Sequence, residues 1–226
     1  MTDYLTIIRE SRLFYDIPSG EINALLKSLG ASTKSYTKNE LIIESGSRVF
    51  GVRLILSGIV RAENIGAHGL QDILTLFSQG DIFGDVLMSG GALSPVSVYA
   101  DCAAEILFVS YDAIMKGEGK FHAKLRENLF LEISGKYFRL HRKIRYLSAR
   151  SLRTKIALFI LDASSTTASS STFDSGISRE SLAALLGVNR SALSRELARM
   201  REDGIISFFK SSFKVENAEK LRDCII

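Results

Sequence analysis

The sequence predicts an α+β protein with an N-terminal antiparallel β-barrel, one long helix and a C-terminal winged helix-turn-helix. Three patterns predict this fold class: short β-prone runs punctuated by glycine, an uninterrupted helical pattern over 121–148, and two short helical segments joined by a tight turn over 178–197. The chain of 226 residues is long enough for two domains that each bury a core. We divide it into segments 1–118, 119–149 and 150–226.

The first segment contains apolar, β-prone runs separated by glycine-rich turns. Turn signals every ~8–12 residues are typical of an antiparallel sandwich or barrel. Ser57-Gly58 and His68-Gly69 are predicted to be hairpin tips, and a short helical pattern before the barrel ends at Gly30. The predicted strands are 41–43, 52–56, 73–77, 96–100 and 106–109.

Residues 121–148 are predicted to form one long helix, because apolar residues recur there at alternating spacings of three and four. A regular seam on a helix rich in Lys and Arg favours pairing with the same helix of a second copy, although burial against its own domain would produce a similar pattern. We predict a homodimer, with Leu125 and Leu129 lying off the seam and packing against the barrel. The predicted dimer interface consists of Phe130, Ile133, Tyr137, Leu140, Ile144 and Leu147.

The segment 178–197 has the features of a helix-turn-helix, whose second helix enters the major groove of DNA. Ser178 can accept a hydrogen bond from the first turn of the first helix, and Asn189 can do the same for the second helix. Gly187 stands where the first helix must stop, at a position that favours a positive φ.

The outward face of the second helix carries Arg190, Ser191, Ser194 and Arg195. A hairpin that serves only for packing has no need for such a face, whereas a helix in a DNA groove needs hydrogen-bonding side chains at this spacing. We therefore predict that the segment reads double-stranded DNA. The candidate DNA-binding residues are Ser178, Arg179, Asn189, Arg190, Ser191, Ser194, Arg195 and Lys210.

The rest of the third segment is predicted to complete a winged domain. The β-prone runs 204–209 and 213–215 predict a two-stranded wing, and Lys210 in its turn is placed to contact a phosphate. A helix is predicted at 151–161 and a short closing helix at 217–224, with a Ser/Thr-rich loop at 164–176.

Charge is distributed unevenly along the chain. Residues 1–135 contain 12 Lys and Arg against 16 Asp and Glu, a net charge of −4, whereas residues 136–226 contain 17 against 9, a net charge of +8. A positive surface favours approach to phosphates through counterion release and steering. The basic part is also the part with the helix-turn-helix, so charge and motif indicate the same partner.

Composition disfavours several other classes of protein. Two cysteines, Cys102 and Cys224, are too few for a disulfide framework or a four-thiolate iron–sulfur cluster. No apolar run approaches the ~20 residues of a membrane helix, and the N-terminus lacks the pattern of a signal peptide. We expect a cytoplasmic protein with no membrane partner.

The order of barrel, long helix and winged helix-turn-helix resembles the CRP/FNR family of bacterial transcription regulators over nearly the whole chain. Besides the helix-turn-helix, the resemblance rests on Leu-Ile-Leu-Ser-Gly-Ile-Val at 54–60 and Gly-Asp-Ile-Phe-Gly-Asp at 80–85. It implies an effector-sensing jelly-roll barrel of the cyclic-nucleotide-binding type and a dimerisation helix. It also implies a dimer that binds a near-palindromic operator and RNA polymerase.

The positions that hold cyclic AMP in this family are altered. Members that bind it follow Phe-Gly with Glu for the ribose and later carry Arg-Ser or Arg-Thr for the phosphate. Here Asp85 follows Phe-Gly, Ser94-Pro95 replaces the second pair, and an unpaired phosphate charge would be costly, so cyclic AMP is not the expected effector. The candidate effector-binding residues are Phe83, Gly84, Asp85, Val86, Ser94, Pro95, Val96, Tyr137, Leu140 and His141.

The cofactor stays undetermined. An iron–sulfur cluster is not expected, whereas haem ligation stays open because His122, His141 and Cys102 are available. The effector could equally be an organic small molecule, or the protein could act without one. On the DNA side, Ser194-Arg195 matches the Ser-Arg pair of the FNR branch, but Ser191 replaces the family's frequent Glu, so a different half-site is expected.

The favoured function is an effector-responsive, DNA-binding transcription regulator. The alternatives are a ligand-binding regulatory module that docks protein partners through its helical hairpin, and a haem-based gas or redox sensor of the same fold. An enzyme is not expected. No phosphate-cradling glycine loop stands out, and Asp81 and Asp85 fit barrel geometry better than an acid–base pair.

Overall fold

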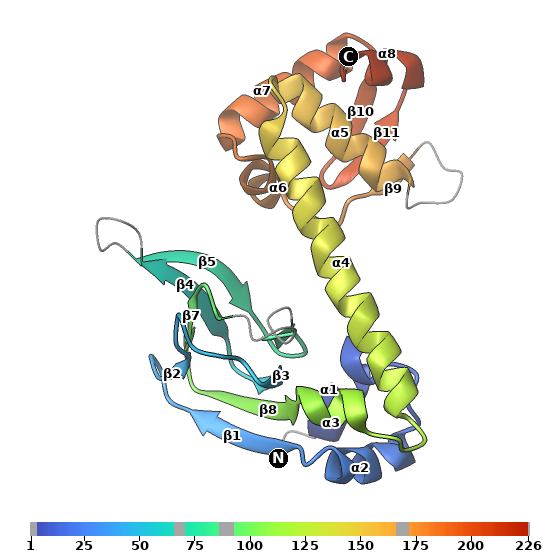
Figure 1. The fold of residues 1–226 in the computed structure, drawn as a ribbon. Helices are drawn as coiled ribbons and strands as arrows, with labels where there is room; N and C mark the ends of the chain where they lie inside the picture. The colour runs from blue at the N-terminus through green and yellow to red at the C-terminus, as the bar shows by residue number, and fades with distance from the viewer. Residues whose placement is uncertain (1–3, 66–70, 86–92, 166–171, 226) are drawn as a thin grey trace. The chain divides into compact units, whose positions relative to one another are not determined.

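The computed structural model describes residues 4–65, 71–85, 93–165 and 172–225 (Figure 1). The chain forms two compact units, residues 1–136 and 137–226, and the dividing point lies inside the long helix α4 (His122–Ser148). Each unit has its own hydrophobic core. Among the described residues, no helix is both long enough and apolar enough to span a bilayer.

Two antiparallel four-stranded sheets form the jelly roll of the first unit. Their strand orders are β1-β8-β3-β6 and β2-β7-β4-β5, and both sheets are open at their edges. All five predicted strands are confirmed, and β1, β4 and β6 are additional. The bounds are β1 (Ser32–Tyr36), β2 (Leu41–Ile43), β3 (Gly51–Ser57), β4 (Val60–Ile65), β5 (Gln71–Phe77), β6 (Ile82–Phe83), β7 (Ser97–Ala100) and β8 (Ala104–Ser110).

The hairpin predicted at Ser57-Gly58 is wrong. The flanking strands β3 and β4 belong to different sheets, so this turn carries the chain from one sheet to the other. Gly58 has φ +87°, and a Cβ there would lie 2.4 Å from the carbonyl oxygen of Ala103. Both the backbone conformation and the close packing therefore require glycine. The other predicted tip, His68-Gly69, lies outside the described residues.

Side chains alternate along β3 between two cores, as the twofold period of a strand requires. Val52, Leu54 and Leu56 pack against the helices, whereas Ile55 faces the core that the two sheets share. The helices on this outer side are α1 (Tyr4–Glu10), the short 3-10 helix η1 (Arg12–Phe14), α2 (Ser19–Ser28), α3 (Tyr111–Lys116) and the first turns of α4.

Three predictions about the helices before and after the barrel are confirmed. The pattern before the barrel forms α2, and Gly30 beyond its end has φ +58°. The long helix runs as expected, as α4. Leu125 and Leu129 are buried in the core between the helices and the sheet.

The second unit is a helical domain with a small sheet (Figure 1). The two predicted helices of the helix-turn-helix are confirmed as α6 and α7, and the predicted closing helix is α8. The helix predicted at 151–161 extends to Ser165. The bounds are α5 (Leu152–Ser165), β9 (Thr172–Asp174), α6 (Arg179–Leu186), α7 (Arg190–Glu202), β10 (Ile206–Phe209), β11 (Ser212–Val215) and α8 (Ala218–Asp223).

The wing contains one strand more than predicted. β9 pairs with β11 and completes a three-stranded sheet of order β10-β11-β9, inside the segment that was predicted as a Ser/Thr-rich loop. Phe173 of β9 stacks on Phe213 of β11 with ring centroids 5.8 Å apart, and both rings are buried. One apolar residue in a polar segment has no periodicity, so only pairing with β11 reveals the strand.

Candidate nucleic-acid interface

The first helix of the helix-turn-helix begins and ends as the sequence predicts. The Ser178 hydroxyl accepts a hydrogen bond from the Ser181 N–H (3.0 Å), which satisfies one free donor of the first turn of α6. Gly187 has φ +63° and ψ +43°, and the Val188 N–H donates back to the Ala183 carbonyl (3.0 Å). A left-handed glycine followed by such a bond stops the helix abruptly.

The second helix, α7, is positioned by its own cap and by its apolar face. The Asn189 side-chain oxygen accepts from the Ser191 N–H (2.8 Å) and from the Ser191 hydroxyl (2.6 Å). Leu193, Leu197 and Met200 are buried against the rest of the unit. With one side of α7 fixed in the core, its opposite side is held outward.

The outward side of α7 presents two arginines. Arg190, Ser191, Ser194 and Arg195 are all exposed. The Ser194 hydroxyl donates to the Arg190 carbonyl (3.0 Å), so it is bonded to its own helix. Within the described part of the chain, no carboxylate lies within ion-pair distance of Arg190 or Arg195, whose guanidinium groups are therefore available to an external acceptor.

A surface hollow lies between the start of α6 and the wing. It encloses about 280 Å³ and is lined by Gly176, Ile177, Ser178, Arg179, Lys210 and Ser211. Lys210 occupies the wing turn with φ +50°, a left-handed conformation that the tight turn imposes. The candidate residues Ser178, Arg179 and Lys210 are thus brought together, although 31 positions separate the last two.

Arg179 lies over aromatic rings of the wing. Its guanidinium carbon is 4.5 Å from the ring centroid of Phe213 and 4.9 Å from that of Phe208. Burial lowers the pKa of Arg179, and its Nη2 is buried without a hydrogen-bond partner in the described structure. Because the Arg179 side chain also lines the hollow, the hollow has a positive charge at its edge.

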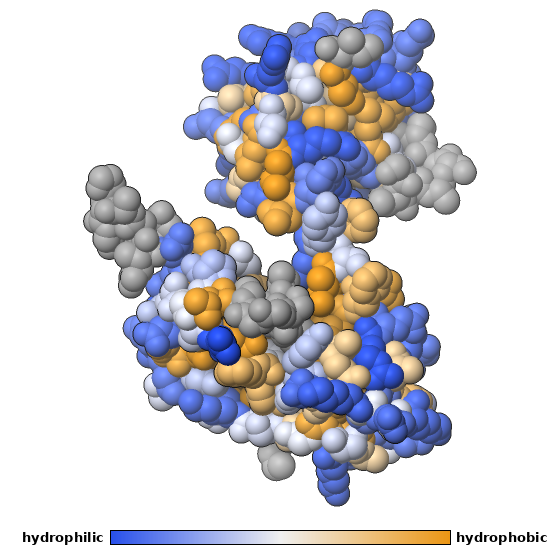
Figure 2. Space-filling model, viewed as in Figure 1, coloured by the Kyte–Doolittle hydropathy of each residue, from blue (hydrophilic) through white to orange (hydrophobic). Residues whose placement is uncertain are grey.

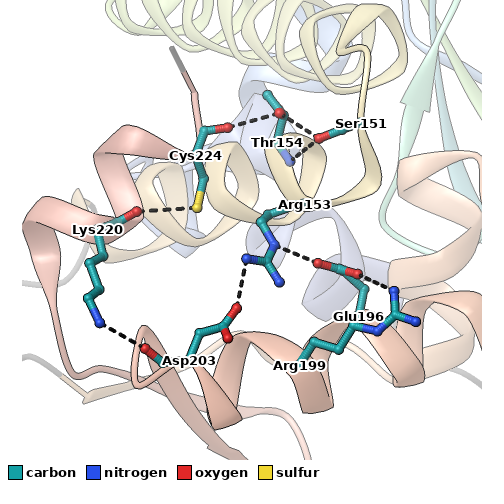
Figure 3. Close-up of polar contacts among 8 residues, drawn as sticks. All are labelled: Ser151, Arg153, Thr154, Glu196, Arg199, Asp203, Lys220 and Cys224. Carbon is teal, nitrogen blue, oxygen red and sulfur yellow. Dashed lines mark hydrogen bonds and ion pairs between the residues drawn. The ribbon is translucent and has the colours of Figure 1, made fainter.

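Ion pairs attach the recognition helix α7 to α5 (Figure 3). The Arg153 side chain of α5 binds the Glu196 carboxylate through Nε (2.6 Å) and the Asp203 carboxylate through Nη1 (2.8 Å). These hydrogen bonds raise the pKa of Arg153. Arg199 adds a longer contact to Glu196 (3.5 Å). Because Glu196 is held inward by Arg153, it does not compete with DNA for the neighbouring Arg195.

The structure places Asp85, an effector candidate, in a buried ion pair. The Lys136 ammonium of α4 lies 2.7 and 2.8 Å from the two Asp85 oxygens and donates to the Ile82 carbonyl (2.7 Å). Gly84 has φ +78°, and Phe83 is buried in the core between the sheets. Sequence reasoning missed Lys136, because 51 positions separate it from Asp85.

The other effector candidates have separate environments. The Ser94 hydroxyl is buried and donates to the Val96 carbonyl (2.7 Å), Pro95 is exposed, and Val86 lies outside the described residues. In the second unit, the exposed rings of Tyr137 and His141 stack at 6.2 Å, and the Leu140 side chain is exposed. Within the described ranges, no group of three His, Cys, Asp or Glu side chains has a geometry that could hold a metal ion.

Two protein-family models match this chain and define the class of protein to which it belongs. Residues 154–224 match the Crp-like helix-turn-helix domain, and residues 33–116 match the cyclic nucleotide-binding domain. Together they define a DNA-binding transcription regulator with an N-terminal domain of the cyclic-nucleotide-binding type. The chain belongs to the CRP/FNR family of transcription regulators. No curated protein sequence matches it significantly.

Solved structures share the fold at low sequence identity. The Thermus thermophilus catabolite activator protein is 21% identical over 95% of this chain and 98% of its own, with a TM-score of 0.54. A CooA mutant from Carboxydothermus hydrogenoformans is 20% identical over 90% of each chain, with a TM-score of 0.54. CprK complexed with OCPA is 15% identical over 88% of this chain and 92% of its own, with a TM-score of 0.57.

Proposed function

We propose that this protein is an effector-responsive transcription regulator that binds a near-palindromic operator as a homodimer. The observation that carries the proposal is the exposed face of α7, on which Arg190 and Arg195 have no carboxylate partner within the described structure. A guanidinium group in the major groove can donate two hydrogen bonds to guanine, the commonest specific contact in such complexes. These two residues would therefore read bases.

The hollow between α6 and the wing would hold a backbone phosphate. Arg179 and Lys210 each supply a positive charge, and the capped start of α6 adds the positive end of a helix dipole. Phosphate contacts of this kind fix the position of a protein on DNA without reading sequence. Ser178 and Asn189 would support this interface chiefly as helix caps.

Exposed apolar side chains on α4 support the homodimer. Of the predicted seam, Ile133 packs partly into the first unit, whereas the other five side chains are 45–69% exposed. Figure 2 shows hydrophobic side chains at the surface along this helix. A large exposed apolar stripe on a helix is costly in water and marks an association surface. Pairing the helices would also place two recognition helices on one DNA molecule.

The proposed effector is not cyclic AMP. Asp85, at the position of the family's ribose-binding Glu, is already neutralised by Lys136, and Ser94-Pro95 supplies no guanidinium for a cyclic phosphate. Either change weakens nucleotide binding, because a buried phosphate charge needs a paired cation. RNA polymerase is the further partner that the proposed function implies.

The proposal is tested by selecting a DNA site from a random pool and measuring affinity for it at several salt concentrations. Arg195→Ala should weaken specific binding by about 1–3 kcal/mol and leave binding to random DNA nearly unchanged. The control is Arg222→Ala, which removes the same charge from an exposed position on α8. Equal losses on specific and random DNA would make Arg195 a phosphate contact. No DNA affinity at any salt concentration would favour the protein-docking alternative.

The dimer is tested by sedimentation equilibrium. Ile144→Asp should shift the protein towards a monomer, because the aspartate would bring a charge into an apolar seam. The matched control is Lys143→Asp, an exposed substitution one residue away and outside the predicted seam. A wild-type protein that sediments as a monomer would remove the basis for a palindromic operator.

A further inference from the structure

Arg53, an arginine of the first unit, lies beside the candidate effector residues Phe83 and Gly84. β3 pairs with β6 so that Arg53 stands opposite Phe83, and with β8 so that it stands opposite Phe108. Cross-strand partners project on the same side of a sheet. Because Phe83 and the i+2 neighbour Ile55 both face the core between the sheets, Arg53 also projects to the inner side of the jelly roll.

The guanidinium of Arg53 has few partners for a partly buried cation. It lies 5.3 Å from the ring centroid of Phe108 and donates one long hydrogen bond to the Gly51 carbonyl (3.3 Å). No carboxylate of the described residues pairs with it, and burial lowers its pKa. An arginine remains protonated at physiological pH, so its charge persists at this inner position.

Two other charged groups of this unit with little exposure, Arg61 and Asp85, are neutralised by described partners, which sets Arg53 apart. Arg61, in the neighbouring sheet, is paired with Glu63 and Asp101. Asp85, two residues after the partner of Arg53 in β6, is already bound by Lys136. Within the described part of this unit, Arg53 is thus a partly buried charge that no carboxylate neutralises.

The backbone beside Arg53 is held close to its guanidinium by a glycine. Gly84 has φ +78°, and a Cβ there would lie 3.3 Å from Arg53 Nη1 and 3.0 Å from the Gly51 carbonyl oxygen. Any larger residue would therefore press on the guanidinium. Arg53 as a whole residue is partly buried and therefore keeps some contact with solvent.

We infer that Arg53 is the anion-binding residue of the effector site. The ligand class is a small organic anion whose carboxylate or phosphate group accepts two parallel hydrogen bonds from the guanidinium, with an apolar part beside the partly buried Phe108. This inference rests on the proposed effector-sensing function of the first unit and names the chemistry of the effector. It also explains how a chain without the family's Arg-Ser pair can hold an anion.

The test measures the melting temperature of the full chain by calorimetry, with benzoate and with inorganic phosphate as probes. Sodium chloride at matched ionic strength and neutral benzamide are the controls. At ten times the dissociation constant, a probe should raise the melting temperature of the first unit by roughly 3–6 °C. A response to benzoate alone identifies a carboxylate ligand, and a response to phosphate alone identifies a phosphate ester.

Arg53→Met should abolish this response and leave the ligand-free melting temperature unchanged or higher, because an uncompensated charge is removed. The matched variant Arg61→Met should keep the response but melt at a lower temperature, because Glu63 loses its partner. The inference is overturned if Arg53→Met responds like the wild type, if it melts as low as Arg61→Met, or if neither probe exceeds sodium chloride.

DNA affinity, measured separately, distinguishes this inference from the proposed function. A protein that binds the probes through Arg53 but has no DNA affinity would refute the regulator and leave the anion site standing. A protein that binds DNA but shows no rise in melting temperature with either probe would refute the anion site alone.

Discussion

Arg153→Met should destabilise the second unit, because this arginine joins α5 to the recognition helix. The substitution keeps much of the side-chain volume and removes both ion pairs. It leaves the Glu196 carboxylate, whose side chain is 13% exposed, with only the longer contact to Arg199. Asp203, at 48% exposed, can return to water at little cost.

The magnitude follows from this difference in exposure. Exposed ion pairs contribute about 0–1 kcal/mol, and removing one partner of a fully buried pair costs about 3–5 kcal/mol. The Arg153–Glu196 pair lies between these limits, so we expect a loss of about 1–2 kcal/mol in the free energy of unfolding. For a unit of this size the melting temperature should fall by roughly 4–16 °C.

Urea denaturation followed by circular dichroism measures this loss, and binding to the selected DNA site measures its effect on recognition. The control is Lys116→Met, which removes an exposed ion pair with Asp112 in the first unit and should cost less than about 0.5 kcal/mol. Specific DNA affinity should fall in Arg153→Met, because the orientation of α7 is less restrained. If Arg153→Met is as stable as Lys116→Met, these ion pairs do not hold the helix.

Two further substitutions address the turn and the core of the second unit. Gly187→Ala should lower the free energy of unfolding by about 1–2 kcal/mol, because φ is +63° there and the new Cβ would lie 2.6 Å from Leu147 Cδ2. Adding Leu147→Ala should recover only the part of this loss that comes from the clash with Leu147. Urea denaturation measures both losses. Tyr146→Phe should make stability less sensitive to alkali. Burial and the hydrogen bond to Asp162 raise the pKa of Tyr146. Above the unfolded-state pKa of about 10, the wild type therefore loses stability as the pH rises. The free energy of unfolding is measured over a pH series, and an equally steep decrease in the variant would contradict this reasoning.

The features that could be predicted from the sequence are those decided by neighbouring residues. Ser178, Gly187 and Asn189 act on the backbone within four positions of themselves, so their capping interactions were predicted correctly. The same holds for the long helix, whose period is repeated over many turns. A family resemblance then extended these local observations to the order of the domains.

The turn at Ser57-Gly58 shows where such reasoning fails. A serine and a glycine between two β-prone runs are equally compatible with a hairpin and with a crossing between sheets. The residues of the turn do not determine which strand each flanking strand pairs with. For the same reason β9 was not predicted: its single buried residue, Phe173, is buried where it stacks on Phe213 of the paired strand β11. Pairing partners are a property of the folded chain.

The sequence by itself determined the fold class, the positions of the recognition helix and its caps, and the basic character of the C-terminal part. Only the tertiary structure decided which charges meet: Lys136 with Asp85, Arg153 with Glu196, and Arg179 with the rings of the wing. It likewise left Arg53 without a described carboxylate partner. The physical reason is that helix caps and periodicity depend on residues within a turn or two, whereas the partner of a charge is set by chain segments brought together from far apart in the sequence.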